Sequence, residues 1–411
     1  MKKNIIFFAL IFSVSFFSAL LLTPPQVAIP GYKQLTLSDF AFCITAAQGV
    51  FFEGAEHIYV IGEIRNLLRL HFESTLQHAM PFAHPPTALF LFFPFALLAS
   101  KISLYSAQFV WTMLSIGIFL YALSLSRLQS RSKLISLVAI LTILFSKTTI
   151  NTVLIGQSSL IVTGLLILLY DLAKNKQTLA TTTLLIFSGI CCGFKPHYAL
   201  LALLIAQQRH SLSLALKILL GYLSITLFVT FFLSPNWIYE WLQSLKLFTA
   251  EPKNPLFQAV FDPKIMFTFA QVTRDLFGYL PALRISNAFS SLGLLILVTQ
   301  LFRNSRTPPA WLIFLSTYWL FSPYLNYYED LVLVIPLVMI LRDQLASRRL
   351  SICLLFLLSI VLNYQIFALL IAQQGIYLAK VIYLLTCCWI FSSTTDEIEA
   401  SKLAPDPSRI S

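Results

Sequence analysis

The chain has 411 residues, of which 58% are hydrophobic and only 11% are charged. A soluble protein of this length cannot bury that much apolar surface, so the composition excludes a soluble globular domain and indicates a membrane protein. The net charge of +11 is by itself compatible with nucleic-acid binding. The basic residues, however, cluster in short gaps between apolar runs, as in 127–133, 174–176 and 342–349. This is the positive-inside pattern of cytoplasmic loops, and it argues against a nucleic acid as partner.

The first apolar run, Asn4–Leu22, follows two lysines at the N-terminus. It is longer than the apolar core of an ordinary signal peptide, and no small-residue cleavage site follows it. We therefore expect an uncleaved first membrane span that leads outward. Residues 23–84 are the longest polar stretch of the chain. Because one span precedes them, we place them outside as the first outer loop.

Two short helices are predicted within this loop. Ser38-Asp39 is suited to cap the N-terminus of a helix over the apolar segment Phe40–Phe52. Apolar residues then recur at near-helical spacing from Ile58 to Leu76, with charged residues between them. We expect both helices to lie on the outer membrane surface and to be ended by the prolines at 81, 85 and 86.

The remaining apolar runs, together with the basic loops between them, predict about 11 to 13 transmembrane or re-entrant helices. The range reflects Thr87–Ala99, which is short and contains Pro94. This segment is either re-entrant or a span that violates the charge rule. We place a second outer loop at residues 234–264 and a polar cytoplasmic tail at residues 392–411. The predicted fold is an all-α polytopic membrane bundle that occupies residues 1–391 as a single domain.

Polar residues occur at a few places where apolar runs end at the membrane–water interface. Under the predicted topology, Asp39, Gln157, Lys195 and the segment 322–330 all lie on the outer side. Such groups cost several kcal/mol in a bilayer unless they face water or one another, so we expect them to form one functional site.

Each of these residues has a chemical and a purely structural interpretation. Asp39 is placed to take a proton from a hydroxyl nucleophile or simply to cap a helix. Lys195 lies between apolar segments, where it is suited either to bind a lipid phosphate or to extend its ammonium to water. Gln157 has the donor and the acceptor to hold a sugar hydroxyl or a phosphate oxygen, and it can equally join two helices.

The segment 322–330 combines aromatic and acidic residues, among them Tyr324, Tyr328 and Asp330. Tyrosines and carboxylates suit sugar binding, although interfacial tyrosines more often form an aromatic belt. Four of the six His residues lie in the first outer loop beside several Glu residues. No His-x-x-x-His pair occurs among them, so we expect no metal site. The chain also lacks the glycine-rich motifs of nucleotide binding and the nucleophile elbow of serine hydrolases.

In their order along the chain, these segments resemble those of glycosyltransferase family 87, membrane enzymes of the GT-C type. The resemblance covers about residues 1–345 and rests on these segments: Ser38-Asp39-Phe40, Ala47-Gln48-Gly49, Phe82-Ala83-His84-Pro85-Pro86, Gly156-Gln157, Ser188-Gly189-Ile190 through Gly193-Phe194-Lys195-Pro196 and Ser322-Pro323-Tyr324 through Asp330-Leu331. Two positions depart from the family pattern, because His84 replaces the usual aromatic residue and Glu329 stands where tyrosine is usual. These departures bear on the sugar and the acceptor rather than on the class of enzyme.

The resemblance implies a GT-C-like bundle that transfers a sugar, often mannose, from a polyprenyl-phosphate donor to a lipid-linked or glycan acceptor, with inversion. Transfer would take place on the outer face of the plasma membrane, which in bacteria is the inner membrane. Asp39 would match the catalytic base, and Lys195 with His197 would hold the donor phosphate, so that no metal or cofactor is needed. The substrate-binding residues that we expect are Gln157, His84, Tyr324, Tyr328 and Asp330. A multi-pass transporter or lipid flippase is the alternative, but the absence of an internal repeat favours an enzyme.

Overall fold

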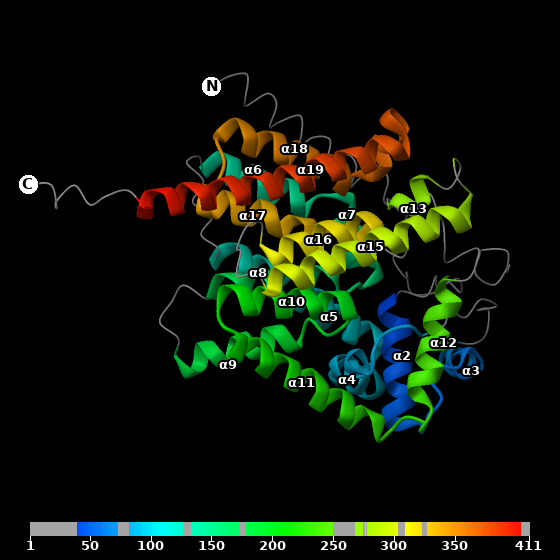
Figure 1. Cartoon of the computed structure of the whole chain (residues 1–411). Coiled ribbons are helices and arrows are strands. Elements are labelled where there is room, and N and C mark those ends of the chain that lie inside the picture. Colours follow the sequence, from blue (N-terminus) through cyan, green and yellow to red (C-terminus); the bar gives the residue numbers. More distant parts are fainter. Residues whose placement is uncertain are drawn as a thin grey trace, which may run out of the picture. The chain divides into compact units, whose positions relative to one another are not determined.

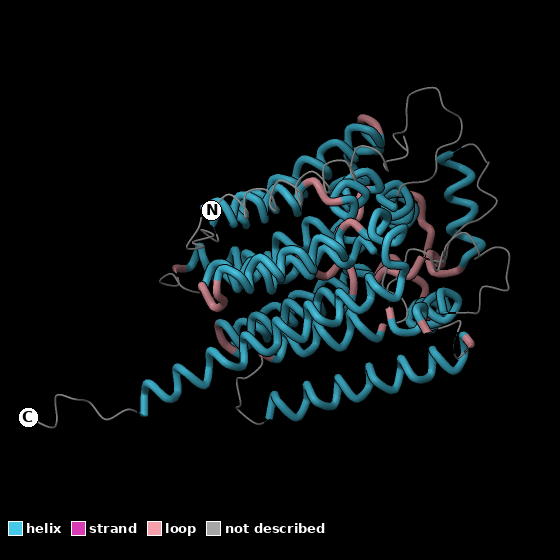
Figure 2. Tube along the Cα trace, turned by 90° about the horizontal axis from the view of Figure 1, so that it is seen from above, coloured by secondary structure: helices cyan, strands magenta, loops and turns pink. Residues whose placement is uncertain are grey.

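The computed structural model of the chain describes residues 39–72, 82–125, 133–172, 178–249, 268–273, 276, 278–302, 309–322 and 327–403. All regular secondary structure in these residues is helical, with loops between the helices (Figure 2). The predicted all-α class is therefore confirmed. The expected first span, Asn4–Leu22, lies outside the described residues.

The structure divides into two compact units, which are described separately. Unit 1 comprises Met1–Ser18, Arg127–Ser146 and Phe267–Ser411, and unit 2 comprises Ala19–Ser126 and Lys147–Met266. Each unit therefore combines segments that are distant in the sequence. The single domain expected over residues 1–391 stays a prediction.

The described helices of unit 2 bring together most of the residues singled out in the sequence (Figure 1). They are α2 (Asp39–Phe52), α3 (Ile61–Phe72), α4 (Pro86–Lys101), α5 (Leu104–Leu125), α7 (Lys147–Ile155), α8 (Ser159–Asp171), α9 (Leu179–Ile190), α10 (Pro196–Arg209), α11 (Leu212–Thr230) and α12 (Trp237–Thr249). The segment Thr87–Ala99, which the sequence predicted either to re-enter or to cross the membrane, lies inside α4. This helix continues past Pro94.

Helix α2 lies in the interior of unit 2. Its residues from Phe40 to Ala47 are all buried, and the helix packs against α3, α4 and α5. The predicted helix is therefore present, but it does not lie on the surface of this unit. The physical reason is its sequence, because a helix that is apolar on every side has no polar face to turn to water.

Helix α3 is amphipathic, as its sequence pattern predicts, with Ile64, Leu67 and Leu68 buried. A second amphipathic helix, α12, lies in the second outer loop, where the sequence analysis predicted no helix. Its Ser244 is fully buried, whereas Tyr239 is 66% exposed.

The apolar stretch 153–170 contains a turn close to its start, at Gly156 and Gln157. Helix α7 ends at Ile155 and α8 begins at Ser159. The chain turns between them at Gly156, whose φ is +70°, and the Gln157 N–H donates to the Thr152 carbonyl oxygen at 2.9 Å. Glycine adopts this left-handed conformation without the steric cost that a Cβ imposes.

The described helices of unit 1 come mainly from the C-terminal third of the chain (Figure 1). They are α6 (Lys133–Leu144), α13 (Phe269–Val272), α15 (Tyr279–Phe302), α16 (Ala310–Phe321), η3 (Tyr327–Leu333), α17 (Val334–Asp343), α18 (Arg348–Leu362) and α19 (Tyr364–Leu403). Helix α15 packs on α16, and α18 packs on α19. Helix α19 runs well into the segment predicted as a polar tail, because no Pro or Gly occurs between Ser392 and Pro405 to end it.

Three of the described helices are long and apolar enough to cross a membrane, namely Ser106–Leu125, Leu212–Thr230 and Leu370–Ser393. The neighbouring segments Leu134–Leu144 and Lys147–Ile155 make a fourth if they are counted as one broken span. The polytopic architecture is thus confirmed, while the total of about 11 to 13 helices that cross or re-enter stays a prediction.

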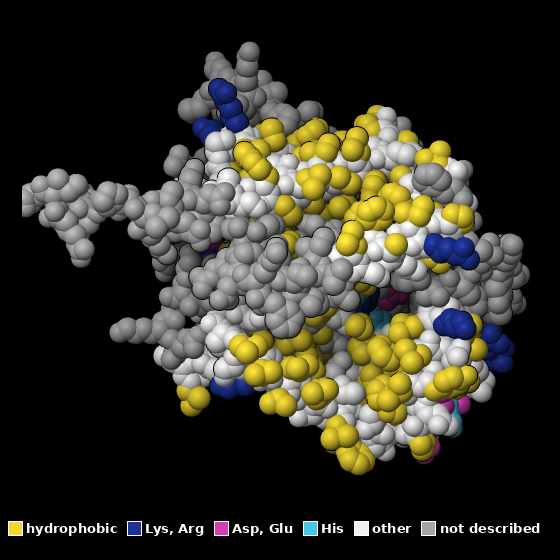
Figure 3. Space-filling model, in the orientation of Figure 1, with side chains coloured by type: hydrophobic (Ala, Val, Ile, Leu, Met, Phe, Trp, Pro, Cys, Tyr) yellow, Lys and Arg dark blue, Asp and Glu magenta, His cyan; other side chains and the backbone are white. Residues whose placement is uncertain are grey.

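Large apolar side chains are exposed on several helices. Phe109 on α5 is 65% exposed, and Leu227 on α11 is 63% exposed. Figure 3 shows apolar side chains over much of the face in view, with few Lys or Arg side chains among them. Apolar surface of this extent is unfavourable in water and is suited to contact with lipid tails. Together with the long apolar helices, it identifies an integral membrane protein.

Candidate functional site

Asp39 is the first residue of α2, and its neighbour Phe40 anchors that end of the helix. The Phe40 side chain is fully buried. Its ring centroid lies 5.6 Å from that of Trp111 and 6.2 Å from that of Phe92. Such aromatic pairs stabilise a structure beyond the burial of their area. Asp39 itself is partly exposed at this well-anchored helix end.

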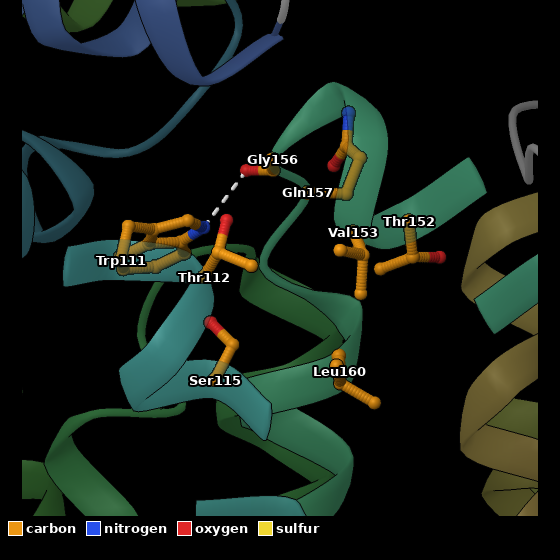
Figure 4. A pocket seen from close by; sticks show the side chains of 8 residues that line it. All are labelled: Trp111, Thr112, Ser115, Thr152, Val153, Gly156, Gln157 and Leu160. Atoms are coloured by element: carbon orange, nitrogen blue, oxygen red, sulfur yellow. Dashed lines mark hydrogen bonds between the residues drawn. The ribbon is translucent and has the colours of Figure 1, made fainter. Parts of the chain in front are cut away.

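The turn between α7 and α8 lies against Phe40. A Cβ added to Gly156 would be only 2.4 Å from the Phe40 Cβ, so close packing as well as backbone geometry requires glycine here. The Trp111 Nε1–H donates to the Gly156 carbonyl oxygen at 3.0 Å (Figure 4). Gln157 follows in the chain, is 6% exposed and lines a narrow pocket with Trp111 and Leu160. The structure therefore places Gln157 near the start of α2.

We expect Gly156→Ala to destabilise the protein by about 3 kcal/mol. Part of this is the strain of a left-handed backbone, about 1–2 kcal/mol, and the rest is the contact with Phe40. Gly54 provides a matched control, because its φ is also +70° but an added Cβ would meet nothing within 4 Å. Gly54→Ala should therefore show the backbone part alone. Thermal unfolding in detergent measures both losses, and equal losses would contradict the importance of the Phe40 contact.

Lys195 precedes the first residue of α10. Its backbone is extended, with φ −141° and ψ 146°. Pro196 follows at the first helical position, where a backbone N–H has no partner to lose. The Lys195 ammonium lies 6.0 Å from the centre of the Tyr198 ring, a distance at which a cation is attracted to an aromatic face. This lysine is partly exposed.

Asp39 and Lys195 each adjoin the same group of rings. Phe194, the residue before Lys195, has its ring centroid 5.1 Å from that of Phe92 and 5.4 Å from that of Trp111. These are the rings that also contact Phe40. We refer to Phe40, Phe92, Trp111 and Phe194 as the aromatic cluster. It ties the start of α2 to the start of α10.

The two charged groups also face the same part of α2. The Lys195 ammonium lies within electrostatic range of the Cys43 thiol, and so does the Asp39 carboxylate. Cys43 is four residues after Asp39, which places both side chains on one face of the helix. Lys195 therefore lies near the face of α2 that carries Asp39.

His84 joins this region through its backbone partner. Its Nδ1–H donates to the Phe194 carbonyl oxygen at 3.1 Å. Burial, and secondarily the positive charge of Lys195, lowers the pKa of His84 to about 4. The imidazole is therefore neutral at pH 7, with its proton on Nδ1. Lys195 and His84 both lie within electrostatic range of His197. The structure thus brings together His84, Lys195 and His197, while their roles at a substrate stay a prediction.

The neutral state of His84 should make the fold sensitive to acid. The unfolded chain takes up the proton near pH 6.5 and the folded protein only near pH 4. Stability is therefore full above about pH 6.5 and falls as the pH drops from there toward 4. We expect a loss of about 2 kcal/mol between pH 7.5 and pH 5. His84→Asn keeps a hydrogen-bond donor but has no titrating group. Between pH 7.5 and pH 5, the unfolding temperature of this variant should therefore fall less than that of wild type. An identical fall in both proteins would contradict the assignment of the acid sensitivity to His84.

The other predicted substrate-binding residues belong to unit 1. Asp330 and Tyr328 lie in η3, and Tyr324 lies outside the described residues. The Asp330 carboxylate accepts a hydrogen bond from the Lys380 ammonium at 2.5 Å, and neither side chain is more than 2% exposed. A buried pair of this kind is costly to break, because one charge is then left uncompensated. Contact of these residues with a substrate stays a prediction.

Within the described ranges, no group of three or more His, Cys, Asp or Glu side chains has an arrangement that could hold a metal ion. Two histidines of the first outer loop pair with glutamates instead. His57 Nδ1 lies 2.7 Å from a Glu240 carboxylate oxygen, and His71 Nε2 lies 2.7 Å from one of Glu53. The first of these pairs connects the loop before α3 to α12.

Three side chains that no sequence pattern singled out bind backbone carbonyl groups near the site. The Thr87 hydroxyl donates to the Gly193 oxygen at 2.8 Å. In α12, the Trp241 Nε1–H donates to the Ala83 oxygen at 3.1 Å and the Ser244 hydroxyl to the Phe82 oxygen at 2.6 Å. Thr, Ser and Trp are common in apolar helices, so no spacing in the sequence distinguishes these three.

The fold and these residues define a polytopic membrane protein in which a carboxylate, a lysine and two imidazoles gather at one region of unit 2. The family model of glycosyltransferase family 87 matches residues 82–323. This is more than half of the 411 residues, so the chain belongs to glycosyltransferase family 87 and is a membrane glycosyltransferase. No curated protein and no solved structure matches the chain.

The family match confirms the resemblance noted in the sequence and supports an enzyme rather than a transporter or flippase. The matched residues include His84, Gln157, Lys195 and His197. They do not include Asp39, whose assignment rests on its place in the sequence and the structure.

Proposed function

We propose that this glycosyltransferase moves a sugar, mannose in the first instance, from a polyprenyl-phosphate donor to a hydroxyl group of a lipid-linked or glycan acceptor. The reaction inverts the anomeric carbon and takes place on the outer face of the plasma membrane, the inner membrane in bacteria. The observation that carries the proposal is the common location of Asp39 and Lys195. Both adjoin the aromatic cluster, and Lys195 lies near the face of α2 that carries Asp39.

Asp39 acts as the general base. Its carboxylate accepts the proton of the acceptor hydroxyl as the oxygen attacks the anomeric carbon of the donor sugar. The bond between that carbon and the phosphate oxygen breaks, and its electron pair stays on the phosphate. Because the nucleophile enters opposite to the leaving group, the anomeric configuration inverts. The anchored start of α2 holds the carboxylate in place for this step.

Lys195 stabilises the departing phosphate. The donor is a phosphate diester with one negative charge, and the leaving group is a monoester that gains a second one. An ammonium beside the phosphate therefore binds the transition state more strongly than the ground state, which is the condition for a faster reaction. His197 lies within electrostatic range of Lys195 and is the second residue that we assign to the phosphate. Gln157, near the start of α2, is assigned to the sugar.

A transfer assay with the purified protein tests the proposal. Synthetic polyprenyl phosphates carrying labelled mannose, arabinose or glucose are each incubated with a membrane lipid extract as the source of acceptor. We expect a labelled product from the mannose donor, with inverted configuration by nuclear magnetic resonance. Product from a nucleotide sugar but from none of the polyprenyl donors would overturn the donor class. Product from another polyprenyl-linked sugar would correct the sugar alone.

A further inference from the structure

The loop that presents Lys195 contains two backbone carbonyl groups whose partners are side chains. The carbonyl oxygen of Lys195 accepts from the N–H groups of Tyr198 and Ala199 in the first turn of α10. The oxygens of Gly193 and Phe194 accept instead from Thr87 and His84. Both of these loop residues are buried, and a buried carbonyl group that loses its partner is unfavourable. The two hydrogen bonds therefore determine where the backbone before Lys195 lies.

The two donors are held at a fixed spacing. His84 and Thr87 are separated by Pro85 and Pro86, and the backbone of Pro85 is extended with φ −68° and ψ 162°. Proline restricts its own φ and also disfavours helical backbone in the residue before it. The segment from His84 to Thr87 is thus stiff, and its two donors meet consecutive carbonyl groups of the Lys195 loop.

The same segment is held from its other side by α12. The Trp241 indole and the Ser244 hydroxyl donate to the carbonyl groups of Ala83 and Phe82. The start of α12 is held in turn by Glu240, which pairs with His57 and accepts from the Ser234 hydroxyl at 2.9 Å. A continuous set of side-chain-to-backbone hydrogen bonds therefore leads from α12 through residues 82–87 to the loop before Lys195.

We propose that Thr87 and His84 are positioning residues that place the Lys195 ammonium for the donor phosphate, and that α12 sets the position of both. The inference rests on the proposed role of Lys195. It also assigns His84 to the backbone of the Lys195 loop in place of the substrate. The function of the second outer loop is then to fix the position of Lys195 relative to α2, which carries Asp39.

Paired variants separate the hydrogen bond from the volume of each side chain. Thr87→Val keeps the shape and removes the hydroxyl donor, whereas Thr87→Ser keeps the hydroxyl. His84→Phe removes the Nδ1–H donor, whereas His84→Asn keeps an amide donor near that position. We expect Thr87→Val and His84→Phe to lower kcat/KM for the donor about 10-fold with the acceptor KM unchanged. Thr87→Ser and His84→Asn should stay near wild type.

A double variant shows whether Thr87 acts through Lys195. If it does, Thr87→Val combined with Lys195→Ala should lose no more activity than Lys195→Ala alone, since the group to be positioned is already absent. If the activity losses of the two single variants multiply in the double variant, the proposal is overturned. A Thr87→Val enzyme with wild-type donor kinetics, or one in which donor and acceptor KM rise together, would overturn it as well.

A measurement without turnover separates this inference from the proposed function. In detergent, the rate at which an amine-reactive ester labels Lys195 is compared between wild type and Thr87→Val by mass spectrometry. Lys217, exposed on α11, is the internal control. We expect the Lys195 rate to change at least about 3-fold while the Lys217 rate stays constant. If the rate changes but no polyprenyl donor is used, the positioning stands and the proposed function falls. An unchanged Lys195 rate overturns the positioning whatever the donor.

Discussion

Asp39→Asn is expected to lower sugar transfer by about 100-fold to 10,000-fold, the usual contribution of a positioned general base. The substitution keeps the size of the side chain and its ability to accept a hydrogen bond, but an amide cannot take the proton of the acceptor hydroxyl. The packing of α2 should be unaffected, because it depends on Phe40 and the buried residues that follow. The measurement is labelled product formed per minute, beside the unfolding temperature of each protein.

Glu53→Gln is the matched control for this variant. It removes a carboxylate just past the other end of α2, where Glu53 is exposed and pairs with His71. The change in charge and in side-chain chemistry is the same, so retained activity in Glu53→Gln would assign the loss to the position of Asp39. Turnover at the wild-type level in Asp39→Asn would remove Asp39 from the mechanism.

Lys195→Ala is expected to lower kcat/KM for the donor by about 100-fold to 1,000-fold, the range found when a single group that stabilises a developing negative charge is removed. The donor KM should rise and kcat should fall, because Lys195 contacts the phosphate before and during its departure. The acceptor KM should stay the same, since the acceptor carries no phosphate at the reacting centre. Initial rates at varied donor and varied acceptor give these constants separately.

Lys101→Ala serves as the control for Lys195→Ala. Lys101 is exposed in the last turn of α4 and also carries a single positive charge, so its removal tests whether overall charge alone affects donor use. Lys195→Arg keeps a cation in the loop and should recover part of the activity. An unchanged donor dependence in Lys195→Ala would leave this lysine with a structural role only.

The sequence predicted the helical class well because hydrophobic runs and basic loops are local features. The helix at Phe40–Phe52 followed from the N-cap at Ser38-Asp39 and the apolar stretch after it, and the amphipathic α3 followed from helical spacing. The pair Gly156-Gln157 marked a boundary in the sequence, but its packing against Phe40 did not follow from any local pattern. Helix α12 was missed although its apolar residues recur at helical spacing, because it lies inside a segment placed outside the membrane, where an irregular loop was expected. Such elements depend on partners from other segments, which no local pattern records.

The candidate site likewise has features that the sequence predicts and features that only the structure shows. The types of residue that mark it, an acid, a lysine before proline and a Gly-Gln turn, are visible in the sequence because polar groups are rare in so apolar a chain. Their common location depends on the aromatic cluster, whose four rings come from α2, α4, α5 and the loop before α10. Only the packed structure brings those rings together.

The sequence by itself determined that this is an all-helical membrane protein of the glycosyltransferase 87 type, since composition, charge pattern and motif order are properties of the chain. Tertiary structure alone decided that Gly156 must accommodate Phe40, that Asp330 is engaged by Lys380, and that His84 and Thr87 hold the backbone before Lys195. Each of these contacts joins residues at least 50 positions apart. Contacts at such separations form only when helices pack, so the geometry of the site follows from the fold rather than from any motif.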